Sequence, residues 1–222
     1  MMNVIDALNS RRSVRQFKSD PVSRDTILKI MAAAGRSPSW ADTQPWEVFI
    51  ATGKTLDKIR HEYLALYQEG QNGAPELTRP VDWPGPLKQR MMENMAHRMA
   101  AMGIDRNDEK AREANTKRNY DFFGAPAVAY LCLDRSLTAW SIFDMGILAQ
   151  SIMIAGQEYG VDSIPAVSLV AYPDVIRTEL GISGDLMILF GIAMGYIQAD
   201  DPVNKPRSLR RPVEAFVHLK EN

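Results

Sequence analysis

The sequence predicts an α+β fold, and three observations lead to that prediction. Segments with helical and strand-like periodicity alternate along only part of the 222 residues. No Gly-x-Gly-x-x-Gly follows a strand-like segment, so the signature of a doubly wound dinucleotide-binding sheet is missing. No internal repeat is visible. A chain of this length favours one domain, which we place over residues 1–222.

The composition excludes several classes of partner. Hydrophobic residues make up 45% of the chain and charged residues 24%, as in ordinary globular proteins. A formal net charge of −1 implies neither nucleic acid nor an anionic membrane as a partner. We find no apolar run long enough to span a bilayer, and no basic segment followed by an apolar one near the first residue. We therefore expect a cytoplasmic protein.

Helical periodicity dominates the first seventy residues. Pro21 and Ser23 are typical of a helix start, and Gly35 is typical of a helix end. One short run with β-branched and aromatic side chains interrupts the helical patterns and predicts a strand. The expected elements are a helix over residues 4–9, a helix over 23–34, a strand over 48–51 and a helix over 55–68.

Residues 70–119 differ from what precedes them. Glycines and prolines between 70 and 85 break regular structure. Five of the twelve methionines then lie between Met91 and Met102 at helical spacing, and a charged helix is expected over 106–119. Methionine suits a surface that accepts varied apolar shapes. The segment is therefore either a lid over an aromatic substrate or an amphipathic helix packed on the body.

The second half of the chain supplies most of the predicted sheet. A continuous apolar run predicts a buried strand, and two further strand-like runs follow a long helix. The expected elements are strands over 127–133, 163–170 and 187–194, a helix over 140–159 and a short helix from Pro173 to about Gly181. Residues 198–222 contain three prolines and form either an arm that embraces a partner or a frayed end.

The helix over residues 140–159 is apolar around most of its circumference. A helix of this kind must be covered on all sides, because water would otherwise meet its apolar side chains. In a chain this small, two arrangements satisfy that requirement. The helix is either central in the fold or covered by a second subunit.

The stretch from Arg36 to Ala51 joins a predicted helix to a predicted strand. It contains two prolines and two tryptophans among hydroxyl and amide side chains. Pro38 and Pro45 each fix one φ angle and restrict the residue before them. A stiff polar loop beside an aromatic pair suits a flat heteroaromatic ligand. The alternative is a rigid connector with no ligand.

A basic segment runs from Ser10 to Phe17. It places three arginines and two serines within six residues. The planar guanidinium group matches phosphate oxygens, and serine hydroxyls can complete the same shell. The alternative is a solvated surface patch. With the Arg36–Ala51 loop, this segment forms a binding set for an anionic molecule that contains a ring.

Other chemistry has little support in the sequence. The three histidines, His61, His97 and His218, are widely spaced and have no carboxylate or cysteine cluster near them, so we expect no metal site. No Gly-x-Ser-x-Gly elbow is present. The single cysteine, Cys132, lies in an apolar run and reads as a buried residue rather than a nucleophile. A bound cofactor would therefore bring the reactivity.

Six motifs, taken in order, resemble those of the flavin-dependent nitroreductase family. They cover nearly the whole chain, and the ordered set is more specific than any one motif. They are Arg11-x-Ser13-x-Arg15, Ser37-Pro38-Ser39 leading to Gln44-Pro45-Trp46, Phe122-Phe123-Gly124-Ala125-Pro126, Asp144, Gly191 to Tyr196, and Asn204 with Arg207 and Arg210. The resemblance implies a central mixed β-sheet flanked by helices, and an intertwined homodimer with flavin mononucleotide (FMN) at each end of the interface.

The resemblance also implies which residues bind the flavin. Arg11 and Ser13, with Arg207 or Arg210 and with Arg12 beside them, would hold the phosphate. Arg15 would reach the pyrimidine edge of the ring, where a cation stabilises the charge that grows on reduction. Residues from a second subunit and from the third strand would line the ring, with Arg118 or Asn119 as a further contact. These ring-lining residues are Pro38, Ser39, Trp40 and Asp42, and Pro165, Ala166, Val167 and Ser168.

Three departures from the family pattern affect the expected substrate range. Asp42 stands where asparagine is frequent, and an ionised carboxylate facing a reduced flavin is unfavourable, so Asp42 is expected to point elsewhere. Trp40 stands where small residues are common and would narrow the pocket. Val167-Ser168 replaces a Glu-Gly pair of some relatives.

The resemblance implies an FMN-dependent NAD(P)H oxidoreductase. NAD(P)H and a nitroaromatic or quinone acceptor would react in turn at flavin N5, in ping-pong order, without a protein acid or base. NADH and NADPH are not distinguished at this stage. Alternatives that keep the flavin are a dehalogenase, a flavin reductase for a partner enzyme, and a flavin-binding module without turnover. A structural homodimer without flavin is a further alternative.

Overall fold

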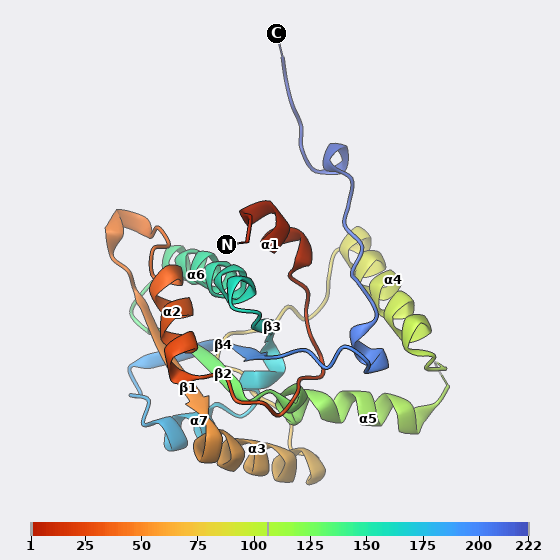
Figure 1. The fold of residues 1–222 in the computed structure, drawn as a ribbon, viewed down its shortest axis with the longest axis horizontal. Helices are drawn as coiled ribbons and strands as arrows, with labels where there is room; N and C mark the ends of the chain where they lie inside the picture. Colours follow the sequence, from red (N-terminus) through yellow and green to blue (C-terminus); the bar gives the residue numbers. More distant parts are fainter. Residues whose placement is uncertain (1, 106, 222) are drawn as a thin grey trace.

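The computed structural model describes residues 2–105 and 107–221 of the chain. One four-stranded sheet lies between two layers of helices (Figure 1). The strands are β1 (Trp46–Thr52), β2 (Ala127–Asp134), β3 (Asp162–Ala166) and β4 (Leu186–Gly195). The helices are α1 (Val4–Ser10), α2 (Arg24–Ala34), α3 (Gly53–Gln68), α4 (Gly85–Met102), α5 (Glu109–Tyr120), α6 (Ala139–Glu158) and α7 (Pro173–Leu180). The predicted α+β class is confirmed.

The sheet has the strand order β1-β2-β4-β3, and all three pairings are antiparallel. Our expectation of a mixed sheet is therefore wrong for the four named strands. Parallel pairing occurs in the described residues as an isolated bridge between Ser13 and Ser163. That bridge joins the basic segment to β3. The parallel pairing therefore involves one of the two segments that the sequence predicts to bind the ligand.

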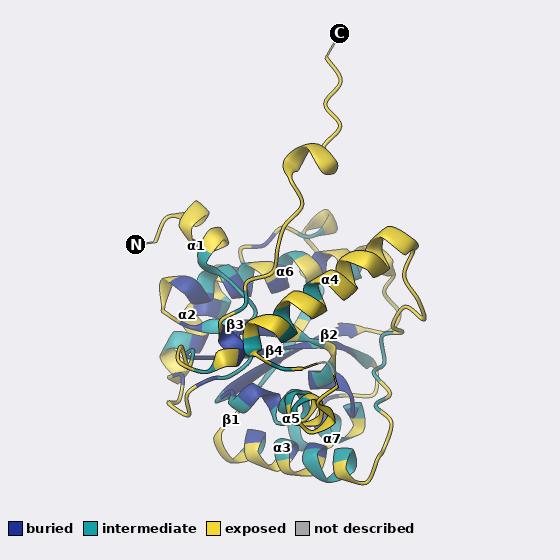
Figure 2. Ribbon diagram, turned by 90° about the vertical axis from the view of Figure 1, so that its right-hand side faces the viewer, coloured by how far each residue is buried: buried dark blue, intermediate teal, exposed yellow. Residues whose placement is uncertain are grey.

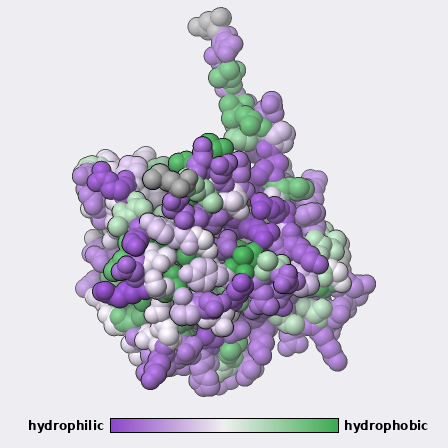
Figure 3. Space-filling view, in the orientation of Figure 1, coloured by the Kyte–Doolittle hydropathy of each residue, from purple (hydrophilic) through white to green (hydrophobic). Residues whose placement is uncertain are grey.

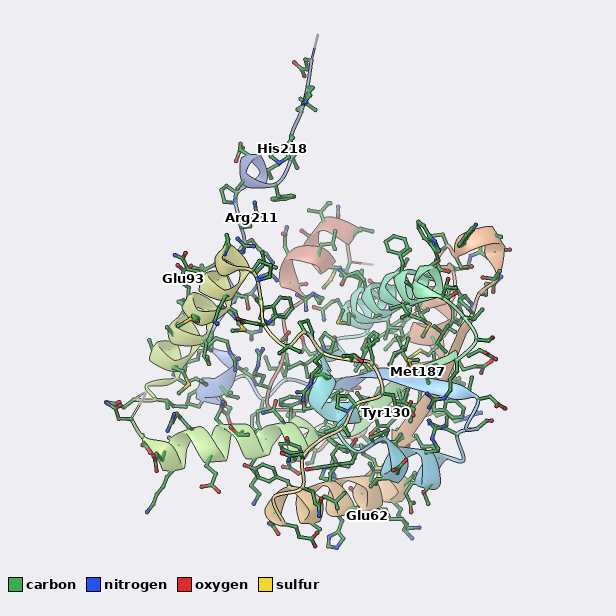
Figure 4. The ribbon with its side chains drawn as sticks, turned by 180° about the vertical axis from the view of Figure 1, so that it is seen from behind. Glu62, Glu93, Tyr130, Met187, Arg211 and His218 are labelled. Carbon is green, nitrogen blue, oxygen red and sulfur yellow. The ribbon has the colours of Figure 1, made fainter. Side chains whose placement is uncertain are left out.

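Strand β2 shows how the sequence builds both layers. Its residues Ala127 to Leu133 are all buried, and successive side chains point to opposite faces. Ala129 and Leu131 pack with α2 and α6 on one face, and Tyr130 and Cys132 pack with α3 and α7 on the other. Figure 4 shows Tyr130 inside the body. Burial raises the pKa of the Cys132 thiol to about 12, in agreement with its predicted role as a core residue.

The third strand is shorter than predicted. Our prediction of a strand over 163–170 is wrong after Ala166, because Val167–Val170 form a 3₁₀ turn, η3. Pro165 supplies no N–H to a ladder, and the turn then packs over Gly191 of β4. A Cβ atom on Gly191 would lie 2.6 Å from Leu169 Cβ, so only glycine leaves room for the turn.

The charged helix of the 70–119 segment begins later than predicted. Its described start is Glu109, after Asp108, whose side chain accepts a hydrogen bond from Ala111 N. Our predicted start, Arg106, lies outside the described residues. The irregular residues before α4 are attached to the body, since Ala74 N donates to Ala171 O at 2.8 Å. The proposed roles of residues 70–119 as a lid and of 198–222 as an arm stay predictions.

Helix α6 packs on the sheet and on α2 but is not covered at its first turns. Trp140 is 62% exposed and Phe143 is 65% exposed. Among the described residues, helix α6 has the length and the apolar composition needed to cross a membrane. Our expectation that no apolar run is long enough to do so is therefore wrong. The core helix of a water-soluble protein passes the same test. In a single chain α6 is therefore not buried on all sides, and its cover by a second subunit stays a prediction.

Exposed residues also dominate α4 and the C-terminal tail (Figure 2). The tail projects from the body, and Arg211 and His218 lie on its outer part (Figure 4). Hydrophobic residues occur along it in the space-filling view (Figure 3). Leu209 and Leu219 are 76% and 77% exposed, so these side chains of the tail have little contact with the body.

Candidate functional site

The basic segment is held against β3 by main-chain hydrogen bonds. Val14 N donates to Ser163 O at 3.1 Å, and Phe17 N donates to Phe123 O at 3.0 Å. The Val14 and Phe17 side chains are buried in the core beneath. Ser13 and Arg15, on either side of Val14, are half-buried at the surface beside β3.

Asn204 shapes the same segment from the far end of the chain. Its side chain is 3% exposed. Its Oδ1 accepts from Arg15 N at 2.8 Å, and its Nδ2 donates to the carbonyls of Gln16 at 2.8 Å and Gln198 at 2.9 Å. The Arg12 guanidinium donates to Asn204 O at 2.8 Å, so this arginine is engaged in the fold. The last of the six motifs contains Asn204, but the motif did not predict that this residue supports the site.

A cavity of about 180 Å³ lies between the basic segment and the tail. We call it the anion cavity. Arg207 is fixed there by a hydrogen bond to Asn9 O at 3.1 Å. Burial, followed by the charge of Arg210, lowers the pKa of Arg11. No Asp or Glu is among the described residues that line it, which are Leu8, Asn9, Arg11, Arg12, Ser13, Arg15, Pro206, Arg207, Ser208 and Arg210.

A second cavity, of about 310 Å³, shares Arg15 with the first. We call it the ring cavity. Burial, followed by the charge of Arg98, lowers the pKa of Arg15 to about 10. The Ser168 hydroxyl is buried without a partner among the described residues. The lining residues are Arg15, Arg98, Asn115, Arg118, Asn119, Phe123, Ile164, Pro165, Ala166, Val167 and Ser168.

The wall made by residues 165–168 is fixed from behind by one tyrosine. Tyr63 Oη donates to Leu169 O at 3.0 Å and accepts from Tyr172 N at 3.1 Å. The Tyr63 side chain is fully buried. These two bonds hold the η3 turn at a defined height over the sheet, and the turn positions the backbone of Val167 and Ser168 along the ring cavity.

The loop with Pro38, Ser39, Trp40 and Asp42 lies elsewhere in the chain. It borders a third cavity, of about 480 Å³, together with the start of α6. Trp40 N donates to both carboxylate oxygens of the buried Asp144 at 3.2 Å. The rings of Trp40 and Trp140 meet edge to face at 5.2 Å between centroids. Asp42 accepts a hydrogen bond from Gln44 Nε2 at 3.1 Å.

This loop is strained as well as stiff. Ala41, Asp42 and Gln44 have φ angles of 51°, 54° and 46°, a region that favours glycine. Ser39 Oγ accepts a hydrogen bond from Gln44 N at 2.9 Å and closes the turn. Non-glycine residues keep this conformation only where the surrounding structure holds them in it, and they occur most often at functional sites. The prolines of this loop predicted that it is rigid but did not predict these positive φ angles.

The two halves of the predicted site are separated within one chain by about two thirds of the length of α6. Ser10, the first residue of the basic segment, donates to Gln157 Oε1 near the end of α6 at 3.2 Å. Trp40 is bound to Asp144 near its start. About 13 residues separate the two α6 positions, or about 20 Å at the helical rise. The chain thus brings residues 11–15, 165–168, 207 and 210 together and leaves 38–42 apart.

Sequence reasoning missed two polar residues of the ring cavity. Arg98 and Asn115 line it from α4 and α5, whereas Arg118 and Asn119 were expected there. Arg98 lies among the methionines of α4, and the helical spacing alone could not say which side of α4 faces the body. The Arg118 guanidinium bonds Gln16 and Asp201, so its charge is partly neutralised.

The donor set fits a molecule with a phosphate and a flat polar ring. The anion cavity offers guanidinium groups without a competing carboxylate among its described residues, and it meets the ring cavity at Arg15. Amide, hydroxyl and guanidinium groups surround the ring cavity, and an unpartnered Ser168 hydroxyl is directed at no other described residue. Such a site binds and orients a cofactor and supplies positive charge.

Comparison with known proteins gives concordant results. The model of the nitroreductase family matches residues 8–196. The chain is 32% identical over 200 residues to nitroreductase NfnB of Mycolicibacterium smegmatis, covering 90% of this chain and 85% of that protein. It is 30% identical over 213 residues to a nitrobenzene nitroreductase of Ectopseudomonas oleovorans, covering 95% of this chain and 94% of that protein.

A solved structure has nearly the same fold. It is described as the FMN and NADPH-dependent nitroreductase NfnB from Sphigopyxis sp. strain HMH, and it superposes with a TM-score of 0.94. The two chains are 30% identical, and each is covered completely. Because the alignment spans the full length, the basic segment, the Arg36–Ala51 loop and the tail all fall within the shared fold.

Proposed function

Because the chain belongs to the nitroreductase family, we propose that it is an FMN-dependent oxidoreductase that transfers electrons from NADPH to nitroaromatic acceptors. The observation that carries the proposal is the junction of the anion and ring cavities at Arg15. FMN joins a phosphate and a flat ring in one molecule, and the two cavities that share Arg15 offer a place for each. The relatives with FMN, NADPH and nitrobenzene in their descriptions support the same chemistry.

The anion cavity would hold the FMN phosphate. Arg11, Arg207 and Arg210 would supply charge-assisted hydrogen bonds, and the Ser13 hydroxyl would add a neutral one. Arg12 would stay bound to Asn204 O and support the segment from behind. Partial burial of these arginines would strengthen phosphate binding, because a guanidinium with few waters and no carboxylate partner gains most from an anionic ligand.

The ring cavity would hold the isoalloxazine. When bound, FMN supplies the hydride chemistry, and the overall change is reduction of a nitro group to a nitroso group and water by NADPH and one proton. Arg15 would place a cation at the pyrimidine edge and favour the reduced form. The wall of Pro165, Ala166, Val167 and Ser168 would orient the ring and exclude water from one side. No acid or base of the chain is needed.

A second copy of the chain would complete the site. Pro38, Ser39, Trp40 and Asp42 lie near the start of α6 and the basic segment lies near its end in one chain, so these loop residues would line the ring cavity of a partner. Trp140 and Phe143 on α6, with Val4 and Ile5 on α1, are exposed and apolar and would be covered by that partner. The tail would reach across it as an arm.

Spectroscopy of the purified protein tests the function. We expect a yellow protein that NADPH bleaches within seconds without oxygen, and that nitrobenzene then restores to yellow. NADH is compared in the same experiment. Steady-state rates should give parallel double-reciprocal lines, since both substrates use one face in turn. Intersecting lines, or colour that NADPH leaves unchanged, would contradict the proposal, and the second result would favour a flavin-binding module.

The assembly is tested by a charge placed on the apolar face. Phe143→Arg should give a monomer in sedimentation equilibrium and lose FMN. The substitution replaces an apolar side chain that the partner would cover with a charge that the dimer would have to bury. The control Glu62→Arg, on the distant helix α3 (Figure 4), should stay dimeric and yellow. A monomeric wild type with full FMN content would rule out the shared site. Cytoplasmic location stays a prediction.

A further inference from the structure

The side of α4 that faces the body carries two polar atoms without a partner among the described residues. Asn94 Oδ1 and Arg98 Nε are both buried. The two residues are four positions apart, so their side chains are neighbours on the helix surface. Glu93 points away from the body (Figure 4). Buried polar atoms without partners are rare in proteins, and each calls for an explanation such as a water or a ligand.

Arg98 extends into the ring cavity, where positive charge exceeds negative charge. The cavity also contains Arg15 and Arg118, and no Asp or Glu is among its described lining residues. Arg118 has an ion pair with Asp201 at 3.3 Å. Burial lowers the pKa of Arg98, as expected for a guanidinium that has lost water without gaining a counter-charge. Among the described residues, Arg15 and Arg98 have no carboxylate partner in this cavity, so an anionic ligand would be their counter-charge.

Under the proposed function, FMN would use only the first of these two cations. Arg15 would meet the pyrimidine edge of the ring, and the phosphate would have its own arginines in the anion cavity. Arg98 belongs to a different element, α4, and lies beside exposed apolar side chains. Met95, three positions earlier, is 53% exposed and is a surface neighbour of Arg98. A polarizable thioether beside a guanidinium suits an aromatic body that carries an acid group.

We propose that Arg98 binds the carboxylate of an aromatic electron acceptor. The inference rests on the proposed function and deepens it, because it names nitroarenes with an acid substituent as the acceptor class. A planar guanidinium can hold a carboxylate through two parallel hydrogen bonds. The carboxylate itself is unchanged in the reaction. The nitro group takes a hydride equivalent from NADPH and a proton from water, and it leaves as nitroso with one oxygen lost as water.

The test compares two acceptors of nearly the same shape, 4-nitrobenzoate and the neutral 4-nitrobenzamide. In the holoenzyme, Arg98→Gln should lower kcat/KM for 4-nitrobenzoate by about 10- to 100-fold, the effect of losing a charge-assisted hydrogen bond. It should change kcat/KM for 4-nitrobenzamide by less than about 2-fold, because the amide has no charge to lose. Arg98→Lys should recover part of the loss. Arg90→Gln, an exposed position on the same helix, is the matched control and should leave both values unchanged.

A binding measurement without turnover gives an independent readout. Benzoate and benzamide are titrated into the oxidised holoenzyme, and binding is followed through the flavin absorbance. We expect Arg98→Gln to raise the Kd for benzoate by about 10- to 100-fold and to leave the Kd for benzamide unchanged.

Three results would overturn the assignment. Equal losses for the charged and neutral acceptors would mean that Arg98 acts on the fold. A slower bleaching by NADPH with unchanged acceptor kinetics would mean that Arg98 binds a phosphate of the nucleotide. Loss of FMN from Arg98→Gln would place Arg98 in the cofactor site. A wild-type protein that lacks FMN or is not bleached by NADPH would instead contradict the proposed function, so the two failures are distinguishable.

Discussion

Arg15 and Asn204 are 189 positions apart in the sequence and are joined by a hydrogen bond of 2.8 Å from Arg15 N to Asn204 Oδ1. The buried side-chain amide also donates to two carbonyls, and the main-chain carbonyl of Asn204 accepts from the Arg12 guanidinium. One side chain thus aligns the basic segment between β3 and the start of the tail. The position of Arg15 at the junction of the two cavities follows from this arrangement.

Asn204→Asp tests that arrangement. The change replaces an N–H donor, which serves the carbonyls of Gln16 and Gln198, with a carboxylate oxygen that repels both. We expect the free energy of unfolding to fall by about 2–3 kcal/mol, because a buried donor is lost and a charge is buried. FMN affinity should fall as well. Urea unfolding and flavin fluorescence measure the two effects. Asn72→Asp, the same change at an exposed position, should affect neither.

Arg11→Gln tests the anion cavity. The Kd for FMN should rise by about 10- to 100-fold, since a charge-assisted hydrogen bond contributes about 1.5–3 kcal/mol. The Kd for riboflavin should not change, because riboflavin has no phosphate. Arg24→Gln, an exposed position on α2, serves as the control for loss of one positive charge. An equal effect on FMN and riboflavin would show that Arg11 does not contact the phosphate.

Arg15→Gln tests the ring cavity. Arg15 is the cation shared by the two cavities, and its lowered pKa reflects burial and the neighbouring Arg98. Loss of this charge should lower the two-electron reduction potential of bound FMN by about 30–60 mV, which corresponds to about 1.5–3 kcal/mol. Dye equilibration under anaerobic conditions measures the potential. An unchanged potential with FMN still bound would place Arg15 away from the ring.

The stability of the protein should depend on pH through Glu76. Burial raises the pKa of Glu76, but the Ile188 N–H and the guanidinium groups of Arg135 and Arg177 outweigh it, so the pKa lies below 4.5 in the folded state. Because a depressed pKa means that the unfolded chain takes up the proton first, this stabilisation is complete above about pH 4.5 and is lost as the pH falls through the folded value.

Glu76→Gln removes that dependence. Urea midpoints of the wild type and the variant should differ at pH 7 and converge as the pH falls through the lowered pKa of folded Glu76, where the wild-type carboxylate is protonated as well. The wild type should be the more stable of the two at pH 7, since the carboxylate accepts from Arg177 at 2.9 Å and from Ile188 N. A constant difference between the midpoints across this range would assign the effect to packing.

Much of the fold could be predicted from periodicity and local capping. The apolar run of β2, the Ser23 N-cap of α2 and the glycine after α7 are local signals, and the structure contains each of those elements close to the predicted bounds. The turn over Val167–Val170 could not be predicted in this way. It depends on the space above Gly191 and on a hydrogen bond from Tyr63, both far away in sequence.

The site was predictable to the extent that its residues share one short segment or one motif. Arg11, Ser13 and Arg15 lie in six residues, and the structure gathers them with residues 165–168, Arg207 and Arg210. The roles of Arg12 and Arg98 were not predictable. The direction of the Arg12 side chain depends on the carbonyl of Asn204, which is distant in sequence. The direction of the Arg98 side chain depends on how α4 packs on the body.

The burial of Cys132 has a consequence for an enzyme of this class. Nitrosoarenes are electrophiles that add to thiolates, and the thiolate is the reactive form of cysteine. The only thiol of the chain is fully buried in β2, with its pKa raised to about 12. Under the proposed function, the protein would therefore withstand its own product, and alkylating reagents should leave its turnover intact until it unfolds.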